Sequence, residues 1–113
     1  MSVNPVQLEM KNQIAVLYLS GDVTGETEID LISNWEKIPI DNSPKIIVNL
    51  QKAEYINSAG IAALITLLNR VNDKNGSLVV SNLNDHFRKV IETVGLTDFI
   101  KVFNTEEDAL AGI

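Results

Sequence analysis

The chain has 113 residues, of which 45% are apolar and 21% are charged, and it contains no cysteine. This length fits one domain with a single core, and no apolar run approaches the roughly 18 residues that a membrane-spanning helix needs. Fifteen acidic residues against nine basic residues give a net charge of −6, which argues against binding a nucleic acid backbone and favours a protein partner. No secretory signal pattern is visible at the N-terminus and disulfides are excluded, so we expect a cytoplasmic protein.

The first half of the chain predicts a hairpin, a helix and a buried strand. Residues 6–10 alternate between apolar and polar side chains, and the longer apolar run 14–19 follows after three polar residues, which predicts two paired strands. A helix is predicted over 27–38, before Pro39. Its apolar residues at helical spacing are Ile29, Ile32, Trp35 and Ile38. The β-branched run 45–50 is typical of a central parallel strand.

The second half alternates helices and strands. A helix is predicted from about Ala59 to Asp73, where Asn75-Gly76 ends it. Its apolar stripe consists of Ile61, Leu64, Ile65, Leu68 and Val71. Strands are predicted over 77–81 and 100–103, a helix over 85–94, and a last helix over 105–111. The inward residues expected on the helix over 85–94 are Phe87, Val90, Ile91 and Val94.

The resulting order is β-β-α-β-α-β-α-β-α, which predicts a single α/β domain over residues 1–113 with a mixed sheet and a mainly parallel centre. Right-handed crossovers bring the loops that follow parallel strands to one edge of such a sheet. The loops expected there are Gly21 to Gly25, Glu54 to Ser58 and Asn82 to Asp85. We place the functional site at this edge.

Ser58 is the candidate functional residue of this edge because it stands between a buried strand and the first turn of an apolar helix. Serine is a favoured N-cap, and a cap is the simpler interpretation of its position. A phosphoryl acceptor is the other interpretation, because a helix N-terminus carries partial positive charge that tolerates a phosphate. Phosphorylation would add about −1.5 to −2 charges, which any partner resting on this helix end would feel.

Small residues at the start of this helix offer a second clue. Ala59, Gly60, Ala62 and Ala63 would let another surface approach the backbone closely if they face outward, with the polar Thr66 continuing that side. The alternative is tight packing of the same residues against the sheet, which is common for small residues at helical spacing.

Four segments of the chain carry a resemblance to a known protein family. Tyr55-Ile56-Asn57-Ser58-Ala59-Gly60-Ile61 resembles the family signature of aspartate, serine, a small residue, glycine and an aliphatic residue. Leu19-Ser20-Gly21-Asp22-Val23 resembles a strand ending in glycine and an acid, and Lys45 to Leu50 resembles the central strand. Val94-Gly95-Leu96-Thr97-Asp98-Phe99-Ile100 resembles the late glycine-leucine-threonine segment. Together, the four segments resemble the STAS domain of bacterial anti-sigma factor antagonists, and the resemblance covers nearly the whole chain.

This resemblance implies regulation by exchange of partners. In the family, the unphosphorylated antagonist binds an anti-sigma factor, commonly a serine kinase, and so frees a sigma factor. Phosphorylation of the signature serine, here Ser58, ends the complex, and a serine phosphatase restores it. The chain is then a substrate and no enzyme, with no cofactor. The partner surface implied by the resemblance comprises Gly21, Asp22, Val23, Thr24, Asn57, Ala59, Gly60, Ala62, Ala63 and Thr66.

Two positions depart from the family pattern. Asn57 stands where an aspartate usually precedes the serine, and Thr24 stands where an aspartate is frequent. Both changes remove a carboxylate near Ser58, which reduces repulsion against a phosphate and alters hydrogen bonds to a kinase. The direction of the net effect on phosphorylation is open.

Other chemistries have less support in the sequence. His86 with Asp22 or Asp85 could serve Ser58 in a hydrolase, but the residues around Ser58 lack the first glycine of a nucleophile elbow. A single histidine without cysteines argues against a metal site. The alternative function is a STAS scaffold or transporter-associated module that binds a protein or a lipid-related ligand without serine phosphorylation.

Overall fold

A computed structural model describes residues 6–39 and 42–113 of the protein. Five strands form one sheet in the order β1-β2-β3-β4-β5, in which β1 is antiparallel to β2 and every other neighbouring pair is parallel. The strands are β1 (Val6–Lys11), β2 (Ile14–Val23), β3 (Lys45–Ile56), β4 (Ser77–Ser81) and β5 (Lys101–Phe103). The predicted α/β fold with a mainly parallel mixed sheet is therefore confirmed.

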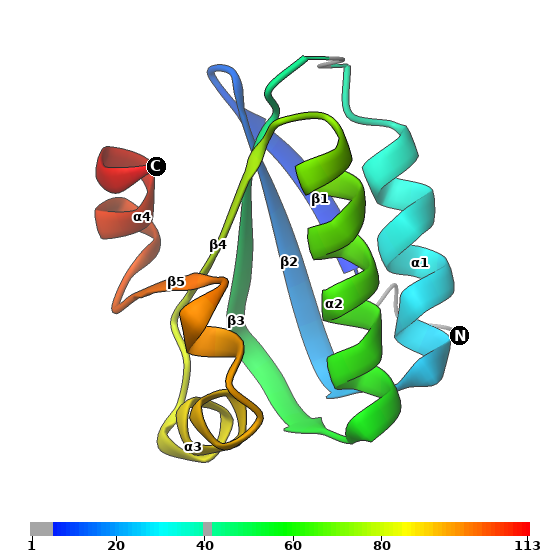
Figure 1. The fold of residues 1–113 in the computed structure, drawn as a ribbon, viewed down its shortest axis with the longest axis vertical. Helices are drawn as coiled ribbons and strands as arrows, with labels where there is room; N and C mark the ends of the chain where they lie inside the picture. The colour runs from blue at the N-terminus through cyan, green and yellow to red at the C-terminus, as the bar shows by residue number, and fades with distance from the viewer. Residues whose placement is uncertain (1–5, 40–41) are drawn as a thin grey trace.

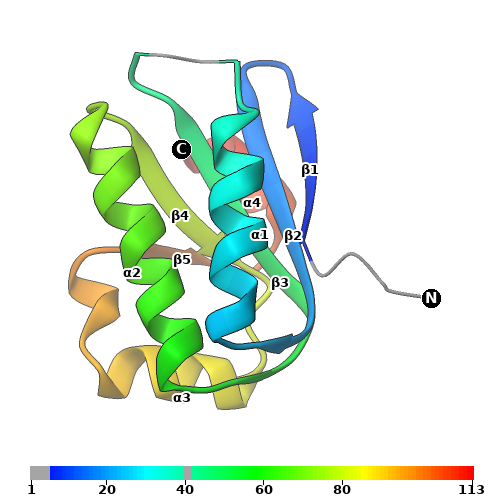
Figure 2. The same ribbon diagram turned by 90° about the vertical axis from the view of Figure 1, so that its right-hand side faces the viewer.

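Helices cover both faces of this sheet (Figure 1). Two long helices, α1 and α2, lie side by side on one face, and the short helix α4 lies on the other (Figures 1 and 2). Helix α3 and a 3-10 turn, η1, connect β4 to β5. Their bounds are α1 (Gly25–Glu36), α2 (Ser58–Asp73), α3 (Asp85–Thr93), η1 (Leu96–Asp98) and α4 (Glu106–Gly112). In the part of the chain that the structure describes, no helix has the length and apolar character needed to cross a membrane.

Residues of each strand alternate between two cores because successive side chains point to opposite faces. On β2, Leu17 and Leu19 pack into the main core beneath α1 and α2, while Val16 points to the other face. The main core also contains Leu64 and Leu67 of α2, both fully buried. The smaller core beneath α4 consists of Val16, Ile47, Val79 and Ala109, with partly buried neighbours. Burial of both faces explains why the parallel strands are rich in β-branched residues.

Helix α4 is tied to the sheet by the carboxylate of Glu106. Its Oε1 atom accepts a hydrogen bond of 3.0 Å from Nδ2 of the buried Asn49 on β3, and its other oxygen forms an ion pair with Lys11 of β1. Burial disfavours the charged form of Glu106, but the hydrogen bonds from Lys11, Tyr18 and Asn49 outweigh burial and lower the pKa of this carboxyl. The hydrogen bond to Glu106 raises the pKa of Lys11. Both shifts keep the pair charged at neutral pH.

Some helix faces differ from the prediction. Ile29 is 73% exposed and Val94 is 49% exposed, so the expectation that these two side chains face inward is wrong. The buried stripe of α1 is Thr27, Leu31 and Trp35, which are four residues apart. Spacing by three drifts around a helix of 3.6 residues per turn faster than spacing by four, so Thr27 rather than Ile29 stays on the inner face. Ile65 on α2 is also partly exposed, at 39%.

Two strands extend beyond their predicted ends. Strand β2 continues to Val23 and β3 continues to Ile56, and the pairs Asp22↔Tyr55 and Val23↔Ile56 join their ends. Gly21 lies inside this extension with a φ angle of 68°, a left-handed value that glycine adopts without strain. Strand β4 ends at Ser81 opposite Asn49, so the loop after β4 is set back from the ends of β2 and β3. The chain nevertheless enters α3 at the same lower end of the sheet where β2 and β3 lead into α1 and α2, as the three expected loops require (Figure 1).

Candidate functional site

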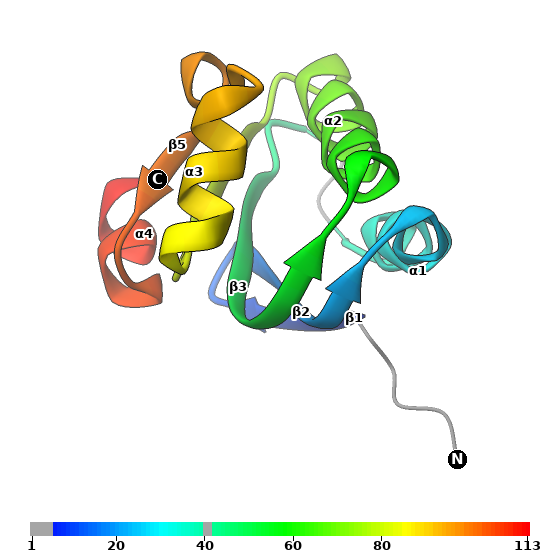
Figure 3. The same ribbon diagram turned by 90° about the horizontal axis from the view of Figure 1, so that it is seen from below.

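The candidate site lies where β2 and β3 end side by side and continue into α1 and α2. Figure 3 views the sheet from below and shows the two strand ends next to each other. The backbone N–H of Asn57 donates a hydrogen bond of 3.2 Å to the carbonyl oxygen of Val23. This bond fixes the start of α2 against the end of β2.

Asn57, and not Ser58, is the N-cap of α2. The Oδ1 atom of Asn57 accepts a hydrogen bond of 2.8 Å from the backbone N–H of Gly60, and its extended backbone has a φ angle of −110°. The expectation that Ser58 caps the helix is therefore wrong, and Ser58 is the first helical residue instead. The physical reason is that Asn57 is still held in the strand ladder by Val23, which places it in the half-helical position that a cap occupies.

Ser58 presents its hydroxyl to solvent. The residue is exposed, and its side chain forms no hydrogen bond with any residue in the described ranges 6–39 and 42–113. The first backbone N–H groups of α2 lack acceptors within the helix and give this end partial positive charge. A group attached to the Ser58 oxygen would thus meet water and a weakly positive helix end, without displacing the cap that Asn57 provides.

Gly60 permits the close approach of α2 to β2. A Cβ atom at Gly60 would lie 2.0 Å from the carbonyl oxygen of Val23, a distance that no side chain tolerates. Gly60, Ala63 and Val23 are all buried. The expectation that Gly60 and Ala63 lie on the outward side of the helix is therefore wrong, and the alternative of tight packing against the sheet is correct for these two residues.

The outward small residues are Ala59 and Ala62, which are both exposed. The first turns of α1 and α2 lie close together at Ala59. A Cβ atom added at Gly25 would lie 3.4 Å from the Ala59 Cβ. Ser58, Ala59 and Ala62 thus form a small-residue surface at the start of α2. A flat partner could approach this surface closely.

The first turn of α1 is organised around Thr24 and Thr27. Thr24 is the N-cap residue, and its backbone N–H donates a hydrogen bond of 2.9 Å to the hydroxyl oxygen of Thr27. The Thr27 hydroxyl in turn donates to the carbonyl oxygen of Asp22 at 3.3 Å. Position 24 thus takes part in this turn through its backbone, so the turn does not depend on the aspartate that the family frequently has there. Gly21 is half-buried beside this turn, while the Asp22 side chain is exposed.

Thr66 takes part in the contact between the two long helices. Its hydroxyl lies 2.9 Å from Oε1 of Glu28 on α1 and 3.0 Å from the carbonyl oxygen of Ala62. These bonds hold Thr66 half-buried between α1 and α2. Its expected contact with a partner stays a prediction.

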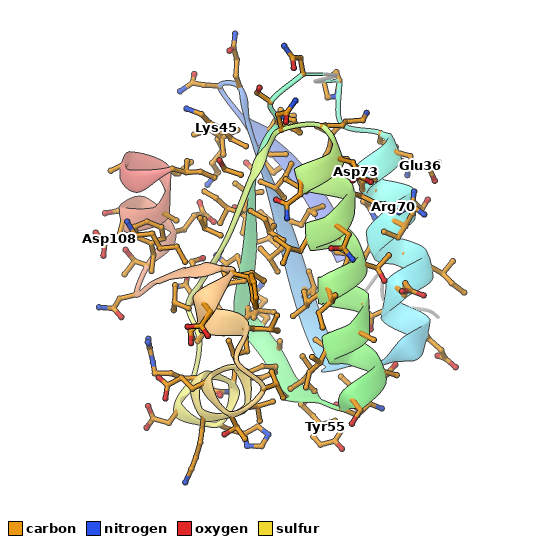
Figure 4. The ribbon with its side chains drawn as sticks, in the orientation of Figure 1. Glu36, Lys45, Tyr55, Arg70, Asp73 and Asp108 are labelled. Atoms are coloured by element: carbon orange, nitrogen blue, oxygen red, sulfur yellow. The ribbon has the colours of Figure 1, made fainter. Side chains whose placement is uncertain are left out.

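Sequence reasoning missed Tyr55 as a site residue. Its side chain is 48% exposed and projects at the lower edge of the molecule, next to the start of α2 (Figure 4). The buried residues Ala53 and Ile56 flank an exposed pair, Glu54 and Tyr55, where strict alternation would turn one of the two inward. This break in the two-residue period marks a bulge in β3. It is a feature of the strand pairing, and the sequence carries no local signal for it.

Acidic side chains predominate around the site, where the exposed Lys52 of β3 is the base that precedes it and pairs with Ser20 of β2. Residues 20–36 and 53–69 contain no lysine or arginine, whereas Asp22, Glu26 and Glu54 are acidic and exposed. His86 is exposed at the start of α3, with its ring against Phe87. Within residues 6–39 and 42–113, no three His, Asp or Glu side chains gather as metal ligands would.

Comparison with known protein families matches residues 5–109 to the STAS domain. The chain belongs to the STAS domain family. This confirms the family that four sequence segments indicated. Among curated STAS relatives, BtrV of Bordetella bronchiseptica is 30% identical over 67 residues, which cover 59% of this chain and 58% of BtrV. The anti-sigma F factor antagonist of Paenibacillus polymyxa is 24% identical over 93% of this chain and 92% of that protein.

Solved structures share this STAS fold. The crystal structure of an anti-sigma factor antagonist from Mycobacterium paratuberculosis superimposes with a TM-score of 0.81 and 21% sequence identity. The superposition covers 96% of this chain and 92% of that structure. The likeness supports the arrangement of sheet and helices described above.

Proposed function

We propose that this STAS protein is an anti-sigma factor antagonist whose complex with an anti-sigma factor ends when Ser58 is phosphorylated. Curated relatives named anti-sigma factor antagonists support the general function. The observation that carries the proposal is the exposed Ser58 hydroxyl, which is free of structural bonds beside a helix cap supplied by Asn57. A residue that can be modified without disturbing the fold suits a switch.

The chemistry is transfer of the γ-phosphoryl group of ATP to the Ser58 oxygen. The Ser58 Oγ atom forms a bond to the γ-phosphorus, the bond from that phosphorus to the bridging oxygen breaks, and ADP leaves while a base of the kinase takes the hydroxyl proton. A serine phosphatase reverses the modification by hydrolysis, which releases inorganic phosphate. This chain is the substrate in both reactions and catalyses neither.

The phosphate would end the complex through its size, charge and hydration. The small side chains of Ser58, Ala59 and Ala62 let a partner lie close to the helix. A phosphate dianion on Ser58 would be buried under that partner and would have to give up its hydrating water. The neighbouring segments 20–36 and 53–69 offer no lysine or arginine to neutralise the phosphate. In the free chain, the partial positive charge at the start of α2 and the uncharged Asn57 allow a phosphate on Ser58 without loss of stability. The phosphate therefore destabilises the complex and not the fold.

The proposal is tested with purified anti-sigma factors of the source organism, each titrated with the wild-type chain and with Ser58→Ala. We expect one anti-sigma factor to bind both chains. Incubation with ATP should then add one phosphoryl group to the wild-type chain alone, on the peptide that contains Ser58, as measured by intact mass and peptide mass spectrometry. Binding by no anti-sigma factor, or modification at another residue, would refute the proposal.

The same experiment separates the alternative function. A STAS scaffold or transporter-associated module would bind its partner without any change in mass after incubation with ATP and each anti-sigma factor. Its affinity would also be indifferent to charge at Ser58. The exposed and unbonded hydroxyl of Ser58 favours the switch over this alternative.

A further inference from the structure

We propose that Tyr55 and Asp22 form a docking patch for an arginine side chain of the protein partner. In the patch, the guanidinium group stacks on the Tyr55 ring and pairs with the Asp22 carboxylate. The inference rests on the proposed function, because it describes how the partner of the Ser58 surface is recognised. It concerns Tyr55, which has no task in the phosphoryl transfer described above.

The bulge in β3 creates the patch. Gly21 pairs with Ala53 and Asp22 pairs with Tyr55, so β3 carries one extra residue, Glu54, between two consecutive pairs. Because of the extra residue, Tyr55 is exposed and pairs with the exposed Asp22 on the neighbouring strand. Bulges interrupt ladder hydrogen bonds and occur preferentially where a side chain is re-aimed next to a functional site. The bulge at Glu54 lies immediately before the cap and the acceptor of α2.

The Tyr55 side chain belongs to neither core of the fold. Its neighbours Ala53 and Ile56 are 4% exposed each and belong to the main core, whereas the Tyr55 side chain is 48% exposed. A half-exposed tyrosine loses little conformational entropy when a partner covers it, because its side chain has only two torsion angles. Exposed, rigid tyrosines of this kind are enriched among residues that contribute most to protein interfaces.

The charges at this end of the sheet select a cationic partner group. Three exposed acids, Asp22, Glu26 and Glu54, accompany Tyr55. The nearest base along β3 is Lys52, so acids outnumber bases at this end of the sheet. Registered residues on neighbouring strands lie about 5 Å apart, so one side chain can reach both Tyr55 and Asp22. Arginine fits this pair better than lysine does, because a planar guanidinium stacks on an aromatic ring while its N–H groups donate to a carboxylate.

The patch also connects recognition to the switch. Tyr55 and Ser58 flank the two residues Ile56 and Asn57 at the start of α2. A phosphoryl group on Ser58 would hold the partner surface away from α2. Loss of the stacked geometry at Tyr55 would follow from modification at Ser58.

The first test measures affinity for the anti-sigma factor that binds the wild-type chain. Tyr55→Leu should weaken binding by about tenfold, whereas Tyr55→Phe should stay within about twofold because the ring is kept. Phe99→Ala is the matched control, since Phe99 is an exposed aromatic residue, at 74%, away from the site. Asp22→Asn should weaken binding about threefold or more, and its effect should not add fully to that of Tyr55→Leu because both residues hold one group. A Tyr55→Leu affinity equal to that of Phe99→Ala would overturn the proposal.

The second test is independent of any anti-sigma factor. The wild-type chain is titrated with N-acetyl-arginine amide and, separately, with N-acetyl-lysine amide, while the NMR signals of the Tyr55 ring and the Asp22 backbone are recorded. We expect saturable shifts with the arginine compound, weaker shifts with the lysine compound, and none with the arginine compound in Asp22→Asn. Equal shifts with both compounds, or no shift at Tyr55, would overturn the inference. If this test succeeds and no anti-sigma factor binds, the proposed function fails while the arginine patch stands.

Discussion

The amide oxygen of Asn57 lies 2.8 Å from the backbone nitrogen of Gly60 and closes the first turn of α2. This bond makes Asn57 the cap of the helix, while the neighbouring Ser58 hydroxyl forms no hydrogen bond with any residue that the structure describes. An amide serves as well as a carboxylate in such a cap, because either group offers an acceptor oxygen. The departure from the family aspartate therefore preserves the helix start and removes one negative charge beside Ser58.

The separation of tasks predicts unequal effects on stability for two adjacent substitutions. Asn57→Ala should lower the free energy of unfolding by about 1 kcal/mol, because the Gly60 N–H loses its partner. Ser58→Ala should change it by less than about 0.5 kcal/mol, since an exposed and unbonded side chain is removed. Urea unfolding of both variants measures the difference, with Asn57→Asp as the control that keeps the cap. Equal losses for Asn57→Ala and Ser58→Ala would contradict the assignment of the cap.

The close approach at Gly60 predicts a large effect of one methyl group. Gly60→Ala should destabilise the protein by about 2 kcal/mol or more, because the new Cβ would collide with the backbone of Val23 at 2.0 Å. Gly25→Ala is the matched control in the other helix, where the new Cβ would make an ordinary contact of 3.4 Å with Ala59. Thermal unfolding of the two variants compares them directly. A Gly60→Ala variant as stable as Gly25→Ala would show that α2 does not pack this tightly on β2.

The tether of α4 predicts a specific pH dependence of stability. The hydrogen bonds that Glu106 accepts hold its folded pKa below the ordinary value of 4.5. A carboxyl with a lowered folded pKa stabilises the protein above its unfolded pKa, and this stabilisation is lost as the pH falls through the folded pKa. The wild-type chain should therefore exceed Glu106→Gln in stability at neutral pH, and the difference should shrink below about pH 4.5.

Unfolding of both chains in urea from neutral pH to about pH 3 measures this difference. Asp108→Asn is the control, because Asp108 is an exposed acid of the same helix (Figure 4). Its difference from the wild-type chain should vary less with pH than that of Glu106→Gln. A pH-independent gap between the wild-type chain and Glu106→Gln would contradict the ion pair with Lys11.

Charge at Ser58 should act on partner binding only at that position. Ser58→Asp should weaken binding of the anti-sigma factor, because a carboxylate must then lose water against the partner surface. Ser77→Asp adds the same charge at an exposed serine where β4 begins, at the opposite end of the sheet, and should bind as the wild-type chain does. Isothermal titration of both variants gives the comparison. An equal loss in both would mean that net charge, and not the Ser58 site, controls the complex.

The sequence predicts the fold well because its signals are long and periodic. All predicted strands and helices exist, since apolar runs such as 45–50 and the stripe of α2 are unambiguous. The sequence predicts which side of a helix is buried less well than it predicts the helix itself. On α1, the two isoleucines Ile29 and Ile32 suggested an inner face by hydrophobicity alone. The buried Thr27 could not be foreseen, because its burial depends on the carbonyl of Asp22, which satisfies its hydroxyl through the tertiary structure.

The sequence predicts which segments meet at the candidate site, but it does not predict the local geometry of these segments. Asn57 and Ser58 are both good capping residues, and only the bond from Asn57 to Val23 on another strand decides between them. Gly60 could equally have served a flexible turn or an open surface, and the position of the Val23 carbonyl shows that it serves close packing. The exposure of Tyr55 depends on the pairing register of β2 with β3, which a single chain sequence does not encode locally.

The most direct test of the switch compares two forms of one chain that differ by a single phosphoryl group. The chain is produced with serine and with phosphoserine at position 58, and the affinity of each form for the anti-sigma factor is measured by titration. We expect the phosphorylated form to bind at least about tenfold more weakly while its unfolding curve remains close to that of the unmodified form. Equal affinity of the two forms would contradict the claim that modification of the exposed Ser58 hydroxyl controls docking at the start of α2.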